Sequence, residues 1–104
     1  KIEELKDRFS SILIEDKSLI FNTELTSALE LENMIDVAES IIFSALSRRE
    51  SRGSHQRTDF VNRDDENFLR HSLAYRTEAE SRIEYQDVVI TKWPPAERIY
   101  GKEE

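Results

Sequence analysis

The sequence predicts a mainly α-helical fold that continues into a C-terminal β-hairpin and an extended tail. In the first half of the 104-residue chain, apolar residues recur at three- to four-residue steps, which indicates helices. In the second half, apolar and polar residues alternate, which is typical of strands. A Trp-Pro-Pro sequence at residues 93–95 then forces an extended backbone, because proline restricts its own φ and disfavours a helical predecessor.

Two helices are expected in residues 1–58, the helical part of the chain. One face of a short first helix holds apolar residues at helical spacing: Ile2, Leu5, Phe9 and Ile12 or Leu13. After a polar break, Asn22 or Thr23 can cap a long second helix that runs from about residue 23 to residue 49. Gly53 can adopt the left-handed conformation that ends this helix.

The long helix carries a wide apolar arc. Its members lie within roughly 140° of the helical wheel, and they are Ala28, Leu31, Met34, Ile35, Ala38, Ile41, Ile42, Ala45 and Leu46. One short antiparallel helix covers a narrower seam, so at least one more helix is expected. We expect this helix to belong to a longer protein of which the chain is a piece. The alternative is a homodimer that pairs the uncovered faces.

Three acids share one flank of the long helix: Glu32, Asp36 and Glu39. Like charges at this spacing repel each other by about 0.2–0.5 kcal/mol per pair unless a positive group lies alongside. The flank is therefore either a solvated acidic face or a socket for arginines of a neighbouring domain.

Residues 59–104 are expected to form a loop, a β-hairpin and an extended tail that pack as one unit with residues 1–58. Residues 64–69 can form one helical turn that starts on acids. Residues 69–76 and 82–90 alternate in polarity around a polar turn, which predicts the hairpin. A lone hairpin is marginal in water, so its apolar face needs support. The predicted face consists of Leu73, Tyr75, Ile83 and Tyr85.

Composition excludes several functional classes. The protein carries 15 basic and 22 acidic residues, a net charge of −7 that repels nucleic acid and anionic lipid. It has no cysteine, so disulfides, thiolate catalysis and cysteine-ligated metals are excluded. No stretch approaches the roughly 20 apolar residues of a membrane-spanning helix, so no direct membrane insertion is expected.

No catalytic, cofactor-binding or metal-ligating residue is expected in this sequence. Its two glycines, Gly53 and Gly101, stand too far apart for a phosphate-binding loop. His55 and His71 have no further histidine or cysteine at metal-ligand spacing. A small hydrolase built on His55, Asp59 and a serine lacks both a nucleophile elbow and an oxyanion glycine.

An arginine-rich stretch follows the long helix and is the best candidate for a binding surface. Residues 48–76 contain seven arginines and five acids. The planar guanidinium grips carboxylates and carbonyls, so the stretch suits an interface, although a capped helix end with spare charge has the same composition. Five residues are the candidates for interdomain contact: Glu50, Arg52, Gly53, His55 and Arg57.

Several motifs of the sequence resemble those of one protein family. They are DKSLIFNTEL at residues 16–25, ALEL at 28–31, SRGSH at 51–55, RDDENFL at 63–69, HSLAYR at 71–76 and PPAERIY at 94–100. Together they are similar to the C-terminal region of the flavoprotein subunit of succinate dehydrogenase and fumarate reductase, from about residue 17 to residue 100. The segment of residues 50–55 is also similar to L-aspartate oxidase, whereas the later motifs favour the succinate and fumarate enzymes.

The resemblance implies a helical domain of the three-helix-bundle (spectrin-repeat-like) type followed by a small hairpin, with a further helix before residues 2–13. In the whole enzyme it implies FAD held covalently by a flavin domain, and an iron–sulfur subunit that receives the electrons. None of the family's flavin-linking or substrate-binding residues maps onto this chain. The chain is therefore expected to be non-catalytic, to support the FAD-binding domain of the same polypeptide and to help form the interface with the iron–sulfur subunit.

The resemblance also implies a location. The complex is expected at the cytoplasmic face of the plasma membrane, or on the matrix side in a mitochondrion. Two alternatives remain for the chain: the corresponding domain of a related flavoprotein such as L-aspartate oxidase, and a free-standing acidic helical module that binds a helix in its groove.

Overall fold

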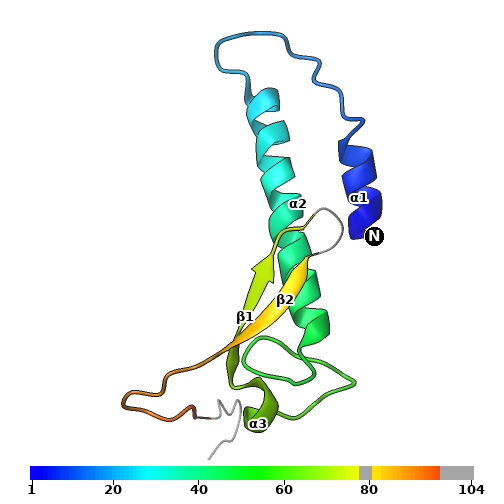
Figure 1. Cartoon of the computed structure of the whole chain (residues 1–104). Coiled ribbons are helices and arrows are strands. Elements are labelled where there is room, and N and C mark those ends of the chain that lie inside the picture. The colour runs from blue at the N-terminus through cyan, green and yellow to red at the C-terminus, as the bar shows by residue number, and fades with distance from the viewer. Residues whose placement is uncertain (78–80, 97–104) are drawn as a thin grey trace, which may run out of the picture.

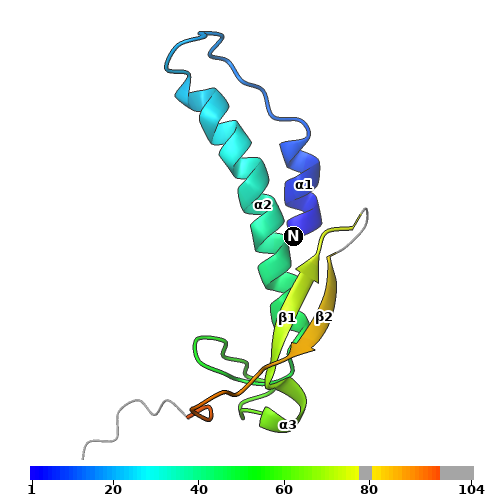
Figure 2. The same cartoon turned by 60° about the vertical axis from the view of Figure 1, so that its left-hand side comes forward.

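The structure, a computed structural model, describes residues 1–77 and 81–96. Its elements in sequence order are α1 (Ile2–Phe9), α2 (Thr23–Ser47), α3 (Asp65–Phe68), β1 (Arg70–Tyr75) and β2 (Arg82–Asp87). The short α1 lies beside α2, and the antiparallel β1–β2 hairpin lies along the C-terminal half of α2 (Figure 1). Figure 2 shows the same arrangement after rotation. The prediction of a mainly helical fold with one long helix and a C-terminal hairpin is confirmed.

The first helix is shorter than its apolar spacing predicts. α1 ends at Phe9, so Ile12 and Leu13 lie beyond it and are exposed. The hydroxyl of Ser10 donates to the Asp7 carbonyl at 2.6 Å, and the hydroxyl of Ser11 donates similarly to the preceding turn. Serine side chains that bond to nearby backbone in this way compete with helix continuation, which explains the early end.

The start of α2 agrees with the prediction. The Asn22 side chain accepts a hydrogen bond from the Leu25 amide at 2.8 Å, which makes Asn22 the N-cap. The Glu24 carboxylate, in the first turn, accepts hydrogen bonds from the amides of Glu15 and Asp16 at 3.0 and 2.6 Å. The loop before the helix is therefore tied to its first turn.

The end of α2 differs from the prediction. The helix stops at Ser47, and Arg48 is extended, with φ −84° and ψ 111°. Gly53 has a positive φ of 59°, but it lies in a separate turn after the helix rather than at its end. Arg48 leaves the helix because its guanidinium bonds to the backbone of residues 68 and 70, a contact that spacing along the sequence does not reveal.

None of the apolar side chains among the described residues is buried. The residues that are buried are polar: Glu39, Glu50, Ser51 and Ser81. On α2, Met34, Ile41 and Leu46 are each more than 60% exposed. Within the described residues the apolar arc is therefore largely uncovered, as predicted.

The predicted apolar face of the hairpin is wrong. In the observed register Ile83 lies opposite Ala74, and Tyr85 lies opposite Ser72, so these pairs share one face. Leu73 lies opposite Glu84 and therefore faces the other way. Strand pairing sets the register, and a shift of the pairing by one residue moves each side chain of a strand to the opposite face of the sheet. The alternation of polarity within each strand predicted the two faces of that strand. It did not determine which face of β1 would lie beside which face of β2.

The tail after β2 contains no helix or strand as far as residue 96. Trp93 is 76% exposed, with the Lys92 ammonium 5.2 Å from the centre of its ring. The remainder of the predicted tail, residues 97–104, lies outside the described residues. Across the described ranges, none of the helices has the length and apolar character needed to span a membrane.

Candidate interdomain interface

Glu50 is the centre of the predicted interface region, and its side chain is fully buried (0% exposed). Its carboxylate accepts hydrogen bonds from Arg52 Nε at 2.8 Å, from Arg52 Nη2 at 3.0 Å and from Arg48 Nη1 at 2.5 Å. The Asp64 amide donates a further bond at 2.9 Å. We call Arg48, Glu50, Arg52, Asp64 and Asp65 the Glu50 cluster. A buried carboxylate with this many donors holds several backbone segments at one point.

Arg48 connects the end of α2 to the hairpin. Besides Glu50, its guanidinium donates to the carbonyls of Phe68 at 2.7 Å and Arg70 at 2.5 Å. It also donates to the Ser72 hydroxyl at 3.2 Å and lies 6.0 Å from the centre of the Tyr85 ring. A single side chain thus joins the last turn of α2 to α3 and β1.

Arg52 extends the cluster towards α3. It bonds the Asp65 carboxylate at 2.5 Å, and Arg63 bonds the other oxygen of that carboxylate at 2.7 Å. The hydrogen bond to Glu50 raises the pKa of Arg52 above its ordinary value, and the bond from Arg52 lowers the pKa of Asp65. The alternating charges therefore stay ionised and attract each other.

Gly53 and His55 form the tight turn that follows. The amide of Arg52 donates to the His55 carbonyl at 2.7 Å, and the His55 amide donates back at 3.0 Å. Gly53, between them, adopts the left-handed φ that bulkier residues disfavour, and it is exposed. His55 Nε2 lies 3.4 Å from the Arg48 carbonyl oxygen. The turn therefore projects from the Glu50 cluster with a defined backbone shape.

Arg57 satisfies the open end of α2. Its Nη1 donates to the carbonyls of Ala45 at 3.2 Å, Leu46 at 2.9 Å and Arg48 at 3.1 Å. The other edge of the guanidinium holds the Asp59 carboxylate at 2.8 and 2.5 Å. The last carbonyls of a helix lack intrahelical partners, so the guanidinium of Arg57 caps the C-terminus of α2.

A cavity of about 480 Å³ opens between α2, this turn and β1. Its lining combines apolar and small residues of α2 with Arg48 at the end of that helix, one residue of the turn and one of β1. The full set is Val37, Ser40, Ile41, Ser44, Ala45, Arg48, His55 and Ser72. The structure therefore brings His55 and Arg48 to an opening that is continuous with the exposed apolar arc.

The five predicted interface residues lie together, but the contacts that they make are with other residues of the same polypeptide. Glu50 faces inward, while Arg52 and Arg57 hold backbone and carboxylate groups of the same polypeptide. Gly53 is exposed and His55 is half-buried. Sequence reasoning missed Arg48, Asp64 and Asp65 as members of the site. The RDDENFL motif was a signal for Asp65. No residue near Arg48 in the sequence indicated that its guanidinium would bond to distant segments of the chain.

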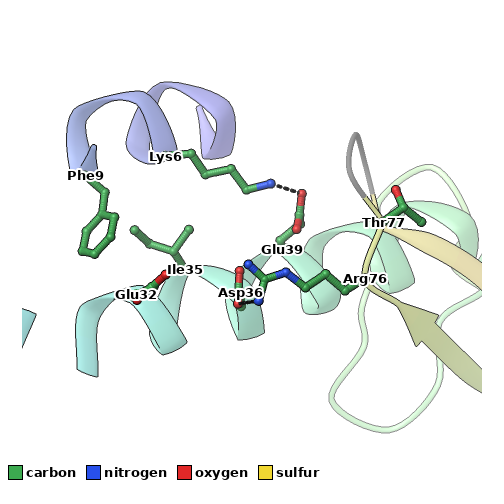
Figure 3. Close-up of a pocket in the computed structure, with 8 residues that line it drawn as sticks. All are labelled: Lys6, Phe9, Glu32, Ile35, Asp36, Glu39, Arg76 and Thr77. Carbon is green, nitrogen blue, oxygen red and sulfur yellow. Dashed lines mark hydrogen bonds and ion pairs between the residues drawn. The ribbon is translucent and has the colours of Figure 1, made fainter. Parts of the chain in front are cut away.

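The acidic flank of α2 has basic partners within the described residues. Lys6 of α1 bonds the buried Glu39 at 2.5 Å, and Arg76 after β1 bonds Asp36 at 2.7 Å (Figure 3). These groups line a cavity of about 590 Å³ between α1, α2 and the end of the hairpin. Lys6 and Arg76 were missed because the sequence does not show which segments pack on this flank. The flank fastens α1 and the hairpin to α2.

Replacing Lys6 by methionine should loosen α1. Glu39 would stay buried without its cation, which weakens the attachment of α1 to α2. Hydrogen exchange of the α1 amides in the complete polypeptide should accelerate about tenfold. Arg8→Met is the matched control, because Arg8 is an exposed base of the same helix with no ion pair among the described residues. Equal exchange in the two variants would contradict the prediction.

Acid should weaken the Glu50 cluster. Burial acts to raise the pKa of Glu50, but the bonds from Arg52, the Asp64 amide and Arg48 outweigh it and lower that pKa. A carboxylate with a lowered folded-state pKa stabilises the fold above its ordinary pKa of 4.5, and this stability disappears as the pH falls through the lowered pKa. Protection of the β1 amides from exchange should therefore fall progressively below pH 4.5, and less so in Glu50→Gln.

Comparisons with known proteins identify the family. The model of the family described as "Fumarate reductase flavoprotein C-term" matches residues 1–100. The sequence is 54% identical over 103 residues to the fumarate reductase flavoprotein subunit of Mycobacterium tuberculosis strain H37Rv, covering 98% of this chain and 18% of that protein. It is 40% identical over 107 residues to the succinate dehydrogenase flavoprotein subunit of Rickettsia felis, covering 95% of this chain and 18% of that protein.

A solved structure agrees. A mutant of Escherichia coli quinol fumarate reductase FrdA superposes with a TM-score of 0.85 at 46% identity, over 99% of this chain and 18% of that one. The chain thus spans about a fifth of the length of the relatives it matches. Sequence, family model and fold agree over nearly all residues, and the chain therefore belongs to the C-terminal domain family of the fumarate reductase and succinate dehydrogenase flavoprotein subunits.

Proposed function

We propose that this protein is the supporting domain of a succinate or fumarate oxidoreductase flavoprotein. It packs against the FAD-binding domain of the same polypeptide and helps to form the surface that meets the iron–sulfur subunit. FAD and the redox chemistry belong to the rest of the enzyme, and this domain supplies no catalytic residue. The observation that carries this proposal is the contrast between an exposed apolar arc and a Glu50 carboxylate that is buried and hydrogen-bonded by several donors.

That contrast has a physical explanation. Burial of apolar surface stabilises domains by about 25 cal/mol per Å², and the described residues bury no apolar side chain. The missing burial has to come from a surface outside these residues. The Glu50 cluster meanwhile fixes the shape of the turn at residues 52–55, so that the turn can meet such a surface with little loss of conformational entropy.

Within this proposal, residues 1–58 and 59–104 act as one unit. The Ser51 hydroxyl donates to the Phe60 carbonyl at 2.7 Å, and the Glu50 carboxylate accepts from the Asp64 amide at 2.9 Å. Both bonds cross the boundary at residue 58. The five interface residues then have separate roles. Glu50, Arg52 and Arg57 set the shape, while the exposed Gly53 and the half-buried His55 make the contact with the FAD-binding domain.

The test is His55→Ala in the complete flavoprotein. We expect the covalently or tightly held FAD per polypeptide, read from flavin absorbance, to fall at least twofold, together with succinate oxidation. Thr58→Ala is the control, because Thr58 is an exposed residue of the same loop outside the proposed contact. Unchanged flavin content and turnover in His55→Ala would count against the proposed interface.

A second copy of this domain is the competing occupant of the apolar arc. The same exposed residues of α2 favour it, because two identical apolar faces can cover each other. Light scattering separates the two proposals. A homodimer has twice the mass of the single domain and does not bind an added FAD-binding domain. The supporting domain instead forms a complex with the added domain.

We further propose a peripheral location at the membrane, reached through the enzyme complex. In a bacterium this places the protein at the cytoplasmic face of the plasma membrane, and in a eukaryote on the matrix side of the mitochondrion. Cell fractionation of a tagged complete flavoprotein tests the location, since deletion of the membrane-bound subunits should then release it into the soluble fraction.

A further inference from the structure

The loop between α1 and α2 presents three consecutive large apolar side chains to solvent. Leu19 is 99% exposed, Ile20 is 75% exposed and Phe21 is 95% exposed. The loop lies at the opposite end of α2 from the Glu50 cluster (Figure 1). At 1.5 Å per residue, the 25 residues of α2 separate the two by about 37 Å. The apolar loop is therefore a surface distinct from the interdomain interface.

The backbone around these residues is well defined. Asp16 Oδ1 accepts a bond from the Ser18 amide at 2.8 Å, which forms an Asx turn. The Asn22 amide group donates to the carbonyls of Asp16 at 2.9 Å and Ser18 at 3.0 Å, while its oxygen caps α2. Residues on both sides of the apolar triplet are thus tied to each other and to the helix.

Phe21 is held in an unfavourable backbone conformation. Its φ is +54°, and it is the one non-glycine residue with a positive φ in the described part of the protein. For a bulky residue this conformation is strained and persists only where the surroundings impose it. The strain accompanies an outward-facing Phe21 ring, which suggests that the exposed position is used.

We propose that Leu19, Ile20 and Phe21 form a plug that inserts into an apolar pocket of the remaining flavoprotein polypeptide. This inference rests on the proposed function, in that it takes the domain to lie against the rest of its own polypeptide. The area favours this occupant. A buried aromatic side chain contributes about 150–250 Å² and the two aliphatic ones less, so the three together stay below the roughly 800 Å² that a stable complex between separate proteins needs from each partner. A contact this small holds only when the partner is tethered at high effective concentration.

The charged residues beside the plug indicate which charges the rim of the pocket should carry. Beside the plug lie three acids, Glu15, Asp16 and Glu24, and one base, Lys17. The acids repel anionic lipid, which disfavours insertion into a membrane surface. They complement a pocket with an apolar floor and a basic rim.

Photocrosslinking in the complete enzyme tests the plug. The purified complex, with all of its subunits and native lipid, carries p-benzoyl-phenylalanine at position 20, and after irradiation the linked peptides are identified by mass spectrometry. We expect a link to a peptide of the same flavoprotein polypeptide outside residues 1–104, at least tenfold stronger than from the same probe at position 11. Ser11 is the control because it is an exposed polar residue at the other end of this loop.

Each other outcome overturns the proposal. A link to another subunit, a link to lipid, or no link above the control would show that the triplet does not occupy a pocket of its own polypeptide. If the variant at position 20 is not recovered, the probe at position 19 repeats the test. Because the flavin content of His55→Ala is measured separately at the far end of α2, failure of the plug is distinguishable from failure of the proposed interdomain interface.

Discussion

Replacing Glu50 by alanine should lower the free energy of opening around α3 and β1 by about 3–5 kcal/mol, because the change removes a buried anion and leaves two partly buried arginines without it. Arg52 and Arg48 lose bonds of 2.8 and 2.5 Å to this carboxylate, and the Asp64 amide loses its acceptor. Native-state hydrogen exchange of peptides spanning residues 62–75, in the complete flavoprotein, measures the loss as a hundredfold or greater gain in exchange rate.

Two further variants make the Glu50 result specific. Glu50→Gln keeps the shape and the acceptor oxygen but removes the charge, so it should lose about half as much, since charge-assisted bonds are roughly twice as strong as neutral ones. Glu66→Ala removes an exposed acid of α3 and should cost less than about 0.5 kcal/mol. If Glu50→Ala behaves like Glu66→Ala, the cluster does not organise this region.

Replacing Arg48 by methionine should separate the end of α2 from the hairpin, at a cost of about 3 kcal/mol. Methionine keeps most of the apolar stem but donates none of the bonds to Glu50, Phe68 and Arg70. The Arg70 carbonyl and its neighbours then open to water. Hydrogen exchange of the β1 amides should accelerate about a hundredfold, while the first turns of α2 stay unchanged.

Arg49 provides a matched control for Arg48. It is the next residue, it is an arginine, and it is exposed with no ion pair or side-chain hydrogen bond among the described residues. Arg49→Met should therefore leave β1 exchange within about twofold of the parent. Arg48→Lys should recover only part of the loss, because an ammonium cannot reach several carbonyls as a planar fork does. Equal effects at positions 48 and 49 would show that Arg48 makes no specific link to the hairpin.

The features that sequence predicted correctly are local ones. The Asn22 cap, the length of α2 within a few residues, the short helical turn at residues 65–68 and the two strands each depend on neighbours in the sequence. Periodicity and capping report such neighbours directly. The family resemblance likewise rested on short contiguous motifs, and the family model and the relatives confirm it.

The candidate site shows where local information stops. The group of Glu50, Arg52, Gly53, His55 and Arg57 was found from composition and spacing, but the burial of Glu50 was not. The partners of that carboxylate include a backbone amide 14 residues away. Arg57 was predicted at an interface, whereas in the structure it also bonds the end of α2. Each of these contacts forms only when the loop folds back on the helix.

By itself the sequence determined that this protein is helical with a hairpin and that it carries a wide apolar arc. Only the tertiary structure decided that α2 ends at Ser47, that Ile83 and Tyr85 share a face with Ala74 and Ser72, and that Lys6 and Arg76 pair with the acids of α2. The physical reason is the separation along the sequence over which each kind of interaction acts. Helix and strand preferences act over a few residues, while register, salt-bridge partners and burial depend on which distant segments meet.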